Sequence, residues 1–138
     1  MKKEDLEKKT KKFAIQVIRF VSAMPKSKIK DVIGCQLLKA GTSIGANYRE
    51  ANRAVSRADF INKIGIVEKE ASECQYWLEL CDSEQIGDAQ LRKELLAECG
   101  EVLAIFTSVG KTAKRNTAAN SKFEIRNSHF EMSPLCAE

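Results

Sequence analysis

Apolar residues recur every three or four positions through most of the first 115 residues of the chain. This spacing places them on one face of a helix and predicts four amphipathic helices, at about residues 5–24, 28–54, 57–82 and 88–114. Pro25 ends the first helix because it keeps the preceding residue out of the α region. N-caps are expected at Ser27, Ser56 and Asp88. Four such helices joined by short loops predict an all-α fold, an antiparallel up-down-up-down four-helix bundle.

The third helix has the most regular pattern, since its apolar residues alternate at intervals of four and three, as in a coiled-coil seam. Tyr76 and Trp77 lie off this seam, and a ring as large as that of Trp77 is expected to mark a subunit contact. The expected core rows are Phe13, Val17, Phe20 and Met24, widened by Ala14, Ile18 and Val21; Ile29, Ile33, Leu37, Ala40, Ile44, Tyr48 or Asn47, Ala51 and Val55; Phe60, Ile64, Val67, Ala71, Cys74, Leu78 and Cys81; and Leu91, Leu95, Cys99, Val102, Phe106, Val109 and Ala113.

The middle of the second helix contains residues that an ordinary helix avoids. Gly41 and Gly45 each cost about 1 kcal/mol relative to alanine in a helix interior. They lie four residues apart on one face, where their missing side chains allow another backbone to come close. Ser43, Asn47 and Glu50 form a neighbouring polar stripe. This segment is therefore expected to be a recognition or assembly element.

The composition indicates one soluble domain with a substantial core. The 138 residues are 43% hydrophobic and 30% charged, and only seven glycines and two prolines argue against an all-β fold. No apolar run reaches the ~18 residues of a transmembrane helix, and the charged N-terminus does not lead into a signal peptide. Five cysteines without a C-x-x-C pair are expected to be reduced cytoplasmic thiols that serve as small hydrophobic residues.

An enzyme is not expected, because the only histidine is His129, near the C-terminus. Di-iron sites in bundles need histidines from two helices, and Cys–His or Ser–His catalysis needs a base beside the nucleophile. No phosphate-binding loop motif is present. No metal or cofactor is expected, and the carboxylates are expected to form ion pairs: Glu50, Glu70 and Glu73 with Arg49, Arg53 or Lys69.

A net charge of +4 permits a nucleic-acid partner but does not require one. The lysine-rich residues 1–12 are interpreted as a solvated first helical turn rather than a nucleic-acid-binding arm. The second helix is basic and the third is acidic. Pairing of these two helices, within or between subunits, and nucleic-acid binding are equally weighted interpretations of Arg49 and Arg53. The candidate contacts to nucleic acid are Lys28, Lys39, Arg49, Arg53 and Arg57, with Tyr48 available to stack on a base.

The regular pattern ends after Arg115, and residues 116–138 are expected to be a disordered tail. Two imperfect copies of Asn-Ser-x-Phe-Glu-apolar, starting at Asn120 and Asn127, indicate a short tandem duplication. A short element that docks on a neighbour is the alternative.

Two motifs of the chain resemble one known family. The first is AGTSIGANYREA at residues 40–51, followed by Ser56-x-x-Asp59-Phe60, and the second is KEASECQYWLEL at residues 69–80. They are similar to the four helix bundle protein family, whose members include proteins encoded within intervening sequences of bacterial 23S ribosomal RNA genes. The resemblance covers about residues 8–115 and leaves the tail outside.

This resemblance implies a left-handed antiparallel bundle that forms a ring-shaped homo-oligomer, typically a pentamer. The fold is also similar to the accessory protein of diversity-generating retroelements, which binds nucleic acid and partners a reverse transcriptase. No catalytic residues come with the resemblance. The positions that match the family's signatures are Ser43, Asn47, Arg49 and Glu50 in the second helix, and Glu70, Glu73, Trp77 and Leu78 in the third.

Two hypotheses follow. The chain is either an RNA-binding oligomer, acting as an RNA chaperone or as an accessory to an RNA process, or a protein-binding scaffold without nucleic-acid affinity. Under the second hypothesis the polar residues are interface only: Ser43, Asn47, Glu50, Glu70, Glu73 and Trp77. Replacing Arg49 and Arg53 by alanine abolishes RNA binding under the first hypothesis and dissociates the ring under the second.

Overall fold

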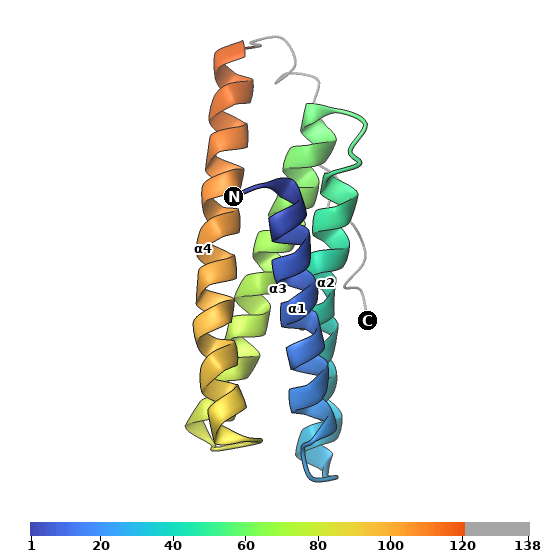
Figure 1. The fold of residues 1–138 in the computed structure, drawn as a ribbon, viewed down its shortest axis with the longest axis vertical. Helices are drawn as coiled ribbons and strands as arrows, with labels where there is room; N and C mark the ends of the chain where they lie inside the picture. The colour runs from blue at the N-terminus through green and yellow to red at the C-terminus, as the bar shows by residue number, and fades with distance from the viewer. Residues whose placement is uncertain (121–138) are drawn as a thin grey trace.

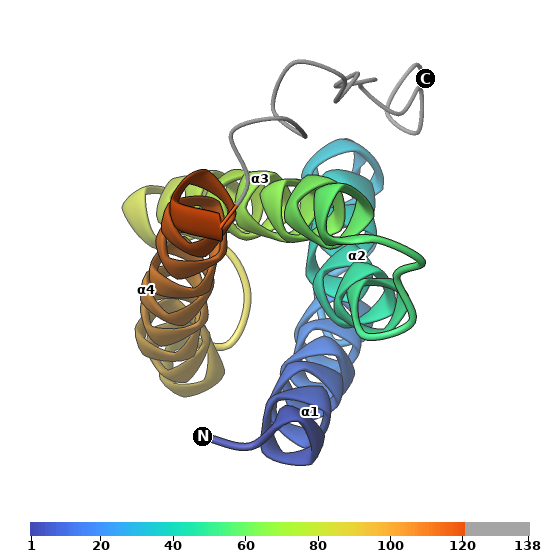
Figure 2. The ribbon, with the colours of Figure 1, turned by 90° about the horizontal axis from the view of Figure 1, so that it is seen from above.

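The computed structural model describes residues 1–120, and within them every regular element is helical. Consecutive helices run in opposite directions (Figure 1), and Figure 2 shows α3 beside both α2 and α4, with α1 beside α2. The expected all-α, four-helix fold is confirmed. The helices are α1 (Lys3–Ser22), α2 (Cys35–Ala51), α3 (Arg57–Ser83) and α4 (Ala89–Asn120), and a π-helical segment, η1 (Lys30–Gly34), leads directly into α2.

The three predicted N-caps are present. The side-chain oxygens of Ser27, Ser56 and Asp88 each accept a hydrogen bond from the backbone N–H three residues later, at 3.1, 3.0 and 2.8 Å. Each bond satisfies one of the N–H groups that the first turn of a helix leaves without a partner. The starts of three helices are therefore fixed by local sequence.

The core follows the predicted rows closely in α3 and α4, where the residues from Ile64 to Cys81 and from Leu95 to Phe106 in those rows are fully buried. Three predicted core residues are exposed instead. Ile18 faces solvent on α1, and Val55 lies beyond the end of α2 with 93% of its surface exposed. Ile29 is exposed because η1 follows it, and a π turn inserts an extra residue that shifts the row.

The predicted helix ends differ by a few residues from those observed. The second helix ends at Ala51 rather than near residue 54, and α4 continues to Asn120 rather than ending near residue 114. Residues 116–120, expected to be part of the tail, are thus helical, and they contain no glycine or proline to stop the helix. The remaining tail, with nearly all of the predicted repeat, lies outside the described residues.

The glycines of α2 bring α1 unusually close. A β-carbon added at Gly41 would lie 2.9 Å from both γ-carbons of Val17, and one added at Gly45 would lie 3.1 Å from Oγ1 of Thr10. Both partners are fully buried on α1. The expectation that another backbone packs against this glycine face is therefore confirmed, and that backbone is α1.

The connection between α3 and α4 is held by a buried arginine. Arg92 donates hydrogen bonds to Oδ1 of Asp82 at 3.0 Å and to the carbonyl oxygens of Ile86 and Gly87 at 3.0 and 3.1 Å. Gly87 has a φ of +81°, and its Cα packs against the ring of Phe20 so closely that an added β-carbon would lie 2.6 Å from it. The loop therefore closes the core at this end of the bundle.

Replacing Gly41 by alanine is expected to lower the free energy of unfolding by about 1–2 kcal/mol, because overpacking against Val17 outweighs the gain in helix propensity. Gly100→Ala in α4 is the matched control. An added β-carbon there meets nothing within 4 Å, so this variant should gain about 0.5–1 kcal/mol. Urea unfolding of both variants tests this, and equal stabilisation by both would show that the α1–α2 approach imposes no constraint.

Arg92→Met is expected to cost about 2–4 kcal/mol, since it leaves two loop carbonyls and the Asp82 carboxylate without their donor. Asp82→Asn should cost less than about 1 kcal/mol, because that carboxylate is largely exposed and Arg92 keeps its two carbonyl partners. Thermal unfolding followed by circular dichroism measures both. Equal losses for the two variants would assign the effect to the ion pair rather than to the loop.

Candidate nucleic-acid interface

The five predicted cations all reach solvent but do not form one compact site. Lys39 and Arg49 are exposed along α2, and Arg53 is exposed in the connection that follows it. Lys28 precedes η1, and its separation from Arg49 corresponds to roughly 31 Å along a helix axis. Arg57 begins α3 and lines a separate cavity of about 990 Å³ with Phe60, Val109 and other residues of α3 and α4. The predicted strip is therefore spread over most of the length of the bundle.

Tyr48 is not available to stack on a base, which corrects the prediction from the sequence. Its side chain is only 4% exposed and packs edge-on against Phe106, with ring centroids 5.0 Å apart. Burial raises the pKa of its phenol above the ordinary value. The apolar row of the second helix passed through either Tyr48 or Asn47, and the structure buries both.

The outward face of α1 carries a set of cations that the sequence analysis did not select. The set has four cations, three lysines and one arginine, and no ion pair joins any of them to another described residue. With an isoleucine and a glutamine they line a depression of about 330 Å³. We call this set the α1 basic surface: Lys8, Lys11, Lys12, Ile15, Gln16 and Arg19. The signal was present in the sequence, because positions 8, 12, 15 and 19 follow helical spacing on the side opposite the core row.

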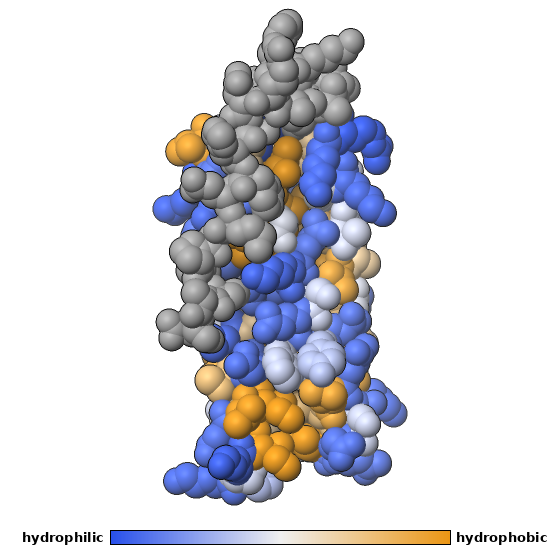
Figure 3. Space-filling view, turned by 180° about the vertical axis from the view of Figure 1, so that it is seen from behind, coloured by the Kyte–Doolittle hydropathy of each residue, from blue (hydrophilic) through white to orange (hydrophobic). Residues whose placement is uncertain are grey.

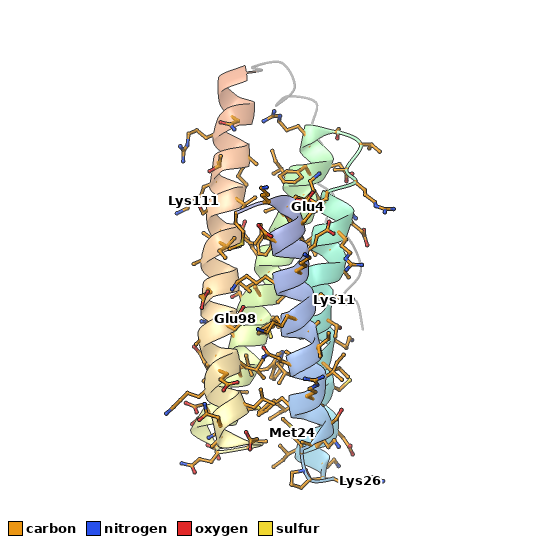
Figure 4. The ribbon with its side chains drawn as sticks, in the orientation of Figure 1. Glu4, Lys11, Met24, Lys26, Glu98 and Lys111 are labelled. Atoms are coloured by element: carbon orange, nitrogen blue, oxygen red, sulfur yellow. The ribbon has the colours of Figure 1, made fainter. Side chains whose placement is uncertain are left out.

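A shallow groove of about 340 Å³ joins this surface to α2. Lys11 from α1 and Arg49 from α2 both line it, as does Gly45. The groove also contains one acid, Glu7, whose carboxylate accepts a hydrogen bond from Asn52 at 2.8 Å. Figure 4 shows Lys11 on the outward side of α1. Of the predicted contacts, Arg49 is the one that the structure brings together with the α1 basic surface.

Lys9 differs from its neighbours because it is bound to α4. Its ammonium lies 2.7 Å from Glu98 and 3.1 Å from Glu101, and Figure 4 shows Glu98 on the side of α4 that faces α1. The hydrogen bond that Lys9 donates to the carboxylate of Glu98 is the main cause that raises the pKa of Lys9. Lys9 therefore links two helices, and the cations beside it remain open to solvent.

The polar stripe of α2 is divided between the core and the edge of the α2–α3 contact, where Glu50 is exposed. Asn47 is buried and donates to the carbonyl oxygen of Ser43 at 2.9 Å. Glu50 pairs with Lys63 of α3 at 2.9 Å, which raises the pKa of that lysine. Ion pairing within the chain was predicted for Glu50, but with an arginine or with Lys69. The stripe thus contributes to the packing of α2 on α3.

The acidic and aromatic candidates of α3 are divided between the core and the surface. Glu70 is buried, whereas Glu73 is half-buried and accepts a hydrogen bond from Nε1 of Trp77 at 3.4 Å. The half-buried ring of Trp77 also stacks edge-on with Tyr76, which is exposed. Trp77 therefore reaches the surface beside an exposed aromatic neighbour.

Exposed hydrophobic side chains occur where the second helix begins and along α3. Ile29, Val32 and Tyr76 are each more than half exposed. Figure 3 views the side of the molecule on which α2 and α3 lie, and hydrophobic residues gather toward its lower end. We call Ile29, Val32, Tyr76 and Trp77 the apolar surface.

The cysteines are mostly core residues, as expected. Cys74, Cys81 and Cys99 are buried, whereas Cys35 is exposed, and Cys136 lies outside the described residues. A hydrogen bond with Cys99, together with burial, raises the pKa of the Cys74 thiol. Residues 1–120 contain no group of three His, Cys, Asp or Glu side chains placed to hold a metal ion. They also contain no helix apolar enough over a sufficient length to cross a bilayer.

Comparison with known proteins connects this fold to a family. The family model described as 23S rRNA-intervening sequence protein matches residues 2–108. The chain belongs to this family. A search among curated proteins gave no match.

A solved structure extends the comparison. It is the crystal structure of a protein with unknown function from the S23 ribosomal protein family of Bacteroides thetaiotaomicron VPI-5482. It is 38% identical to this chain and superposes with a TM-score of 0.72, over 80% of this chain and 99% of the other. The region matched by the 23S rRNA-intervening sequence protein model covers α1 to α3 and much of α4, so it includes the α1 basic surface.

Tyr48→Leu is expected to destabilise the bundle by about 1–3 kcal/mol through lost packing against Phe106. Affinity for RNA, the partner predicted from the sequence, should stay within a factor of about two of the original protein's value, because the buried ring cannot reach a base. Anisotropy titrations below the unfolding temperature, with circular dichroism to confirm the fold, measure this. A large loss of affinity in the folded variant would restore Tyr48 as a contact.

Proposed function

We propose that this member of the 23S rRNA-intervening sequence protein family is a non-enzymatic, homo-oligomeric RNA-binding protein of the bacterial cytoplasm. The observation that carries the proposal is the α1 basic surface together with Arg49. These cations are exposed and close together, and no ion pair joins them to another described residue. Such a surface suits phosphate groups, which dominate the affinity of nucleic-acid-binding proteins.

Self-association is supported by the apolar surface. Exposed hydrophobic residues that gather on one face are typical of contacts between proteins. Rings of Tyr and Trp are also enriched at such contacts. Homo-oligomerisation, with the pentamer that the family resemblance implies, therefore belongs to the proposal. Association with a reverse transcriptase or another protein rests on fold analogy alone.

The alternative function is a protein-binding scaffold without nucleic-acid affinity. Under this alternative the α1 basic surface binds acidic side chains of a protein. The two functions predict different results with RNA at low salt. An RNA-binding protein binds it, and a scaffold does not.

Titration of the purified protein with a ribosomal RNA fragment, followed by fluorescence anisotropy, is expected to give micromolar or tighter binding. The affinity should fall steeply between about 50 and 200 mM salt, because phosphate contacts release counterions. Light scattering on the same sample confirms that the oligomer is intact. No binding by an intact oligomer at low salt would refute the RNA-binding proposal and favour the scaffold.

Val32→Glu is expected to shift the mass measured by light scattering toward the monomer, because it places a charge within the apolar surface. Val55→Glu is the matched control, since Val55 is more exposed but lies in the α2–α3 connection, away from the apolar surface. It should leave the mass unchanged. An unchanged mass for both variants would mean that copies associate elsewhere or not at all.

A further inference from the structure

We infer that the α1 basic surface and Arg49 bind the backbone of double-helical RNA by shape and charge, without reading its sequence. This inference rests on the proposed function and specifies its ligand. The site that we assign is centred on α1, whereas the sequence had pointed to the second helix and the start of the third.

The cations of α1 are arranged in a row along the helix. Lys8, Lys12 and Arg19 follow one another on the outward face of a continuous helix, and Lys8 and Arg19 are separated by about 16 Å along the axis. Lys11 lies beside this row and shares a groove with Arg49 from α2. Because the row lies on one rigid helix, it offers a straight set of cations. A regular duplex presents phosphates at fixed positions, whereas a flexible strand does not require such rigidity.

The residues that line this surface include no aromatic side chain. Proteins that bind single strands stack bases on aromatic rings in addition to contacting phosphates. None of the residues that line the α1 depression or the α1–α2 groove is aromatic. Tyr48 is buried, and the exposed Tyr76 lies on α3. This surface can therefore contact a backbone but cannot hold unstacked bases.

The α1 basic surface also contains two uncharged residues, one apolar and one able to form hydrogen bonds. Ile15 is partly exposed between the cations and offers an apolar contact to a ribose. Gln16 lines the same depression and can both donate and accept a hydrogen bond. A-form RNA displays 2′-hydroxyls across its wide, shallow minor groove, and these groups distinguish RNA from DNA. The surface therefore fits an RNA duplex better than a DNA duplex.

The competing occupant of a basic surface is an acidic protein. Within the chain, Glu98 and Glu101 of α4 pair with Lys9, and the acid in the α1–α2 groove is bonded to Asn52. The four cations therefore form no ion pair with another described residue. A second copy that covered α1 with acidic side chains would make this surface an assembly interface. Variants of the α1 cations distinguish such an interface from an RNA-binding site.

The experiment compares four ligands on the full-length protein: a blunt RNA duplex, each of its separated strands, and a DNA duplex of the same sequence. We expect the RNA duplex to bind at least about five-fold more tightly than either strand or the DNA duplex, at one salt concentration. A second RNA duplex with a scrambled sequence should bind equally well. Preference for a single strand, or strong dependence on sequence, would overturn the inference and leave the proposed function standing.

Two variant proteins test the site. The first carries Lys8→Gln, Lys12→Gln and Arg19→Gln, and the control carries Lys93→Gln, Lys111→Gln and Lys114→Gln on exposed positions of α4. Both lose three positive charges from a net charge of +4. The α1 variant should bind the RNA duplex at least ten-fold more weakly, and its salt dependence should lose about one phosphate contact per cation. The control should change little.

The outcomes separate the two proposals. Failure of the original protein to bind any RNA refutes the proposed function itself. Equal losses in the α1 variant and in the control show that net charge alone matters, which overturns the assignment to α1. Dissociation of the oligomer by the α1 variant without loss of RNA affinity shows that α1 is an interface between copies, which also overturns it.

Discussion

The close approach of α1 to α2 is the constraint on which the rest of the bundle depends. Three glycines, Gly34 of η1 and Gly41 and Gly45 of α2, lie opposite buried side chains of α1. Gly34 faces Val21 at one end, and Gly45 faces Thr10 at the other. Because the glycines lack β-carbons, the two helices pack closely, and Thr10 satisfies its hydroxyl on the carbonyl oxygen of Leu6 within α1. The glycines therefore lower the helix propensity of the segment but allow α1 to pack closely against it.

This packing decides which charges of α1 remain available. α1 meets α4 over a smaller interface than it shares with α2, and that interface includes the ion pairs of Lys9 with Glu98 and Glu101. One face of α1 is thus buried against α2, a second side is held to α4, and the third is left to solvent. The uncompensated cations lie on that third side because both neighbouring helices are already engaged by other residues. Their exposure follows from the topology.

Local sequence predicted much of the fold, because caps and heptads depend on neighbouring residues. Ser56 begins α3 as expected, and the seam from Ile64 to Cys81 is buried throughout. The π turn could not be predicted, because a π turn and an α turn can be formed by residues of the same composition. The core row predicted for a regular α-helix therefore included Ile29, which is exposed. The site was predicted less well. Arg49 was selected and lies beside the α1 basic surface, but Tyr48 is a core residue, and the lysines of α1 had been interpreted as a solvated first turn.

The α1–α2 groove joins the packing of the bundle to its proposed function. Gly45 lines this groove together with Lys11 of α1 and Arg49 of α2. A larger side chain at Gly45 would press on Thr10, which lines the same groove. The same small residue thus allows the helices to approach and leaves the surface between the charges open. Under the proposed function, an RNA backbone that spans both helices would need that opening, and the requirements of folding and of binding would then select the same residue.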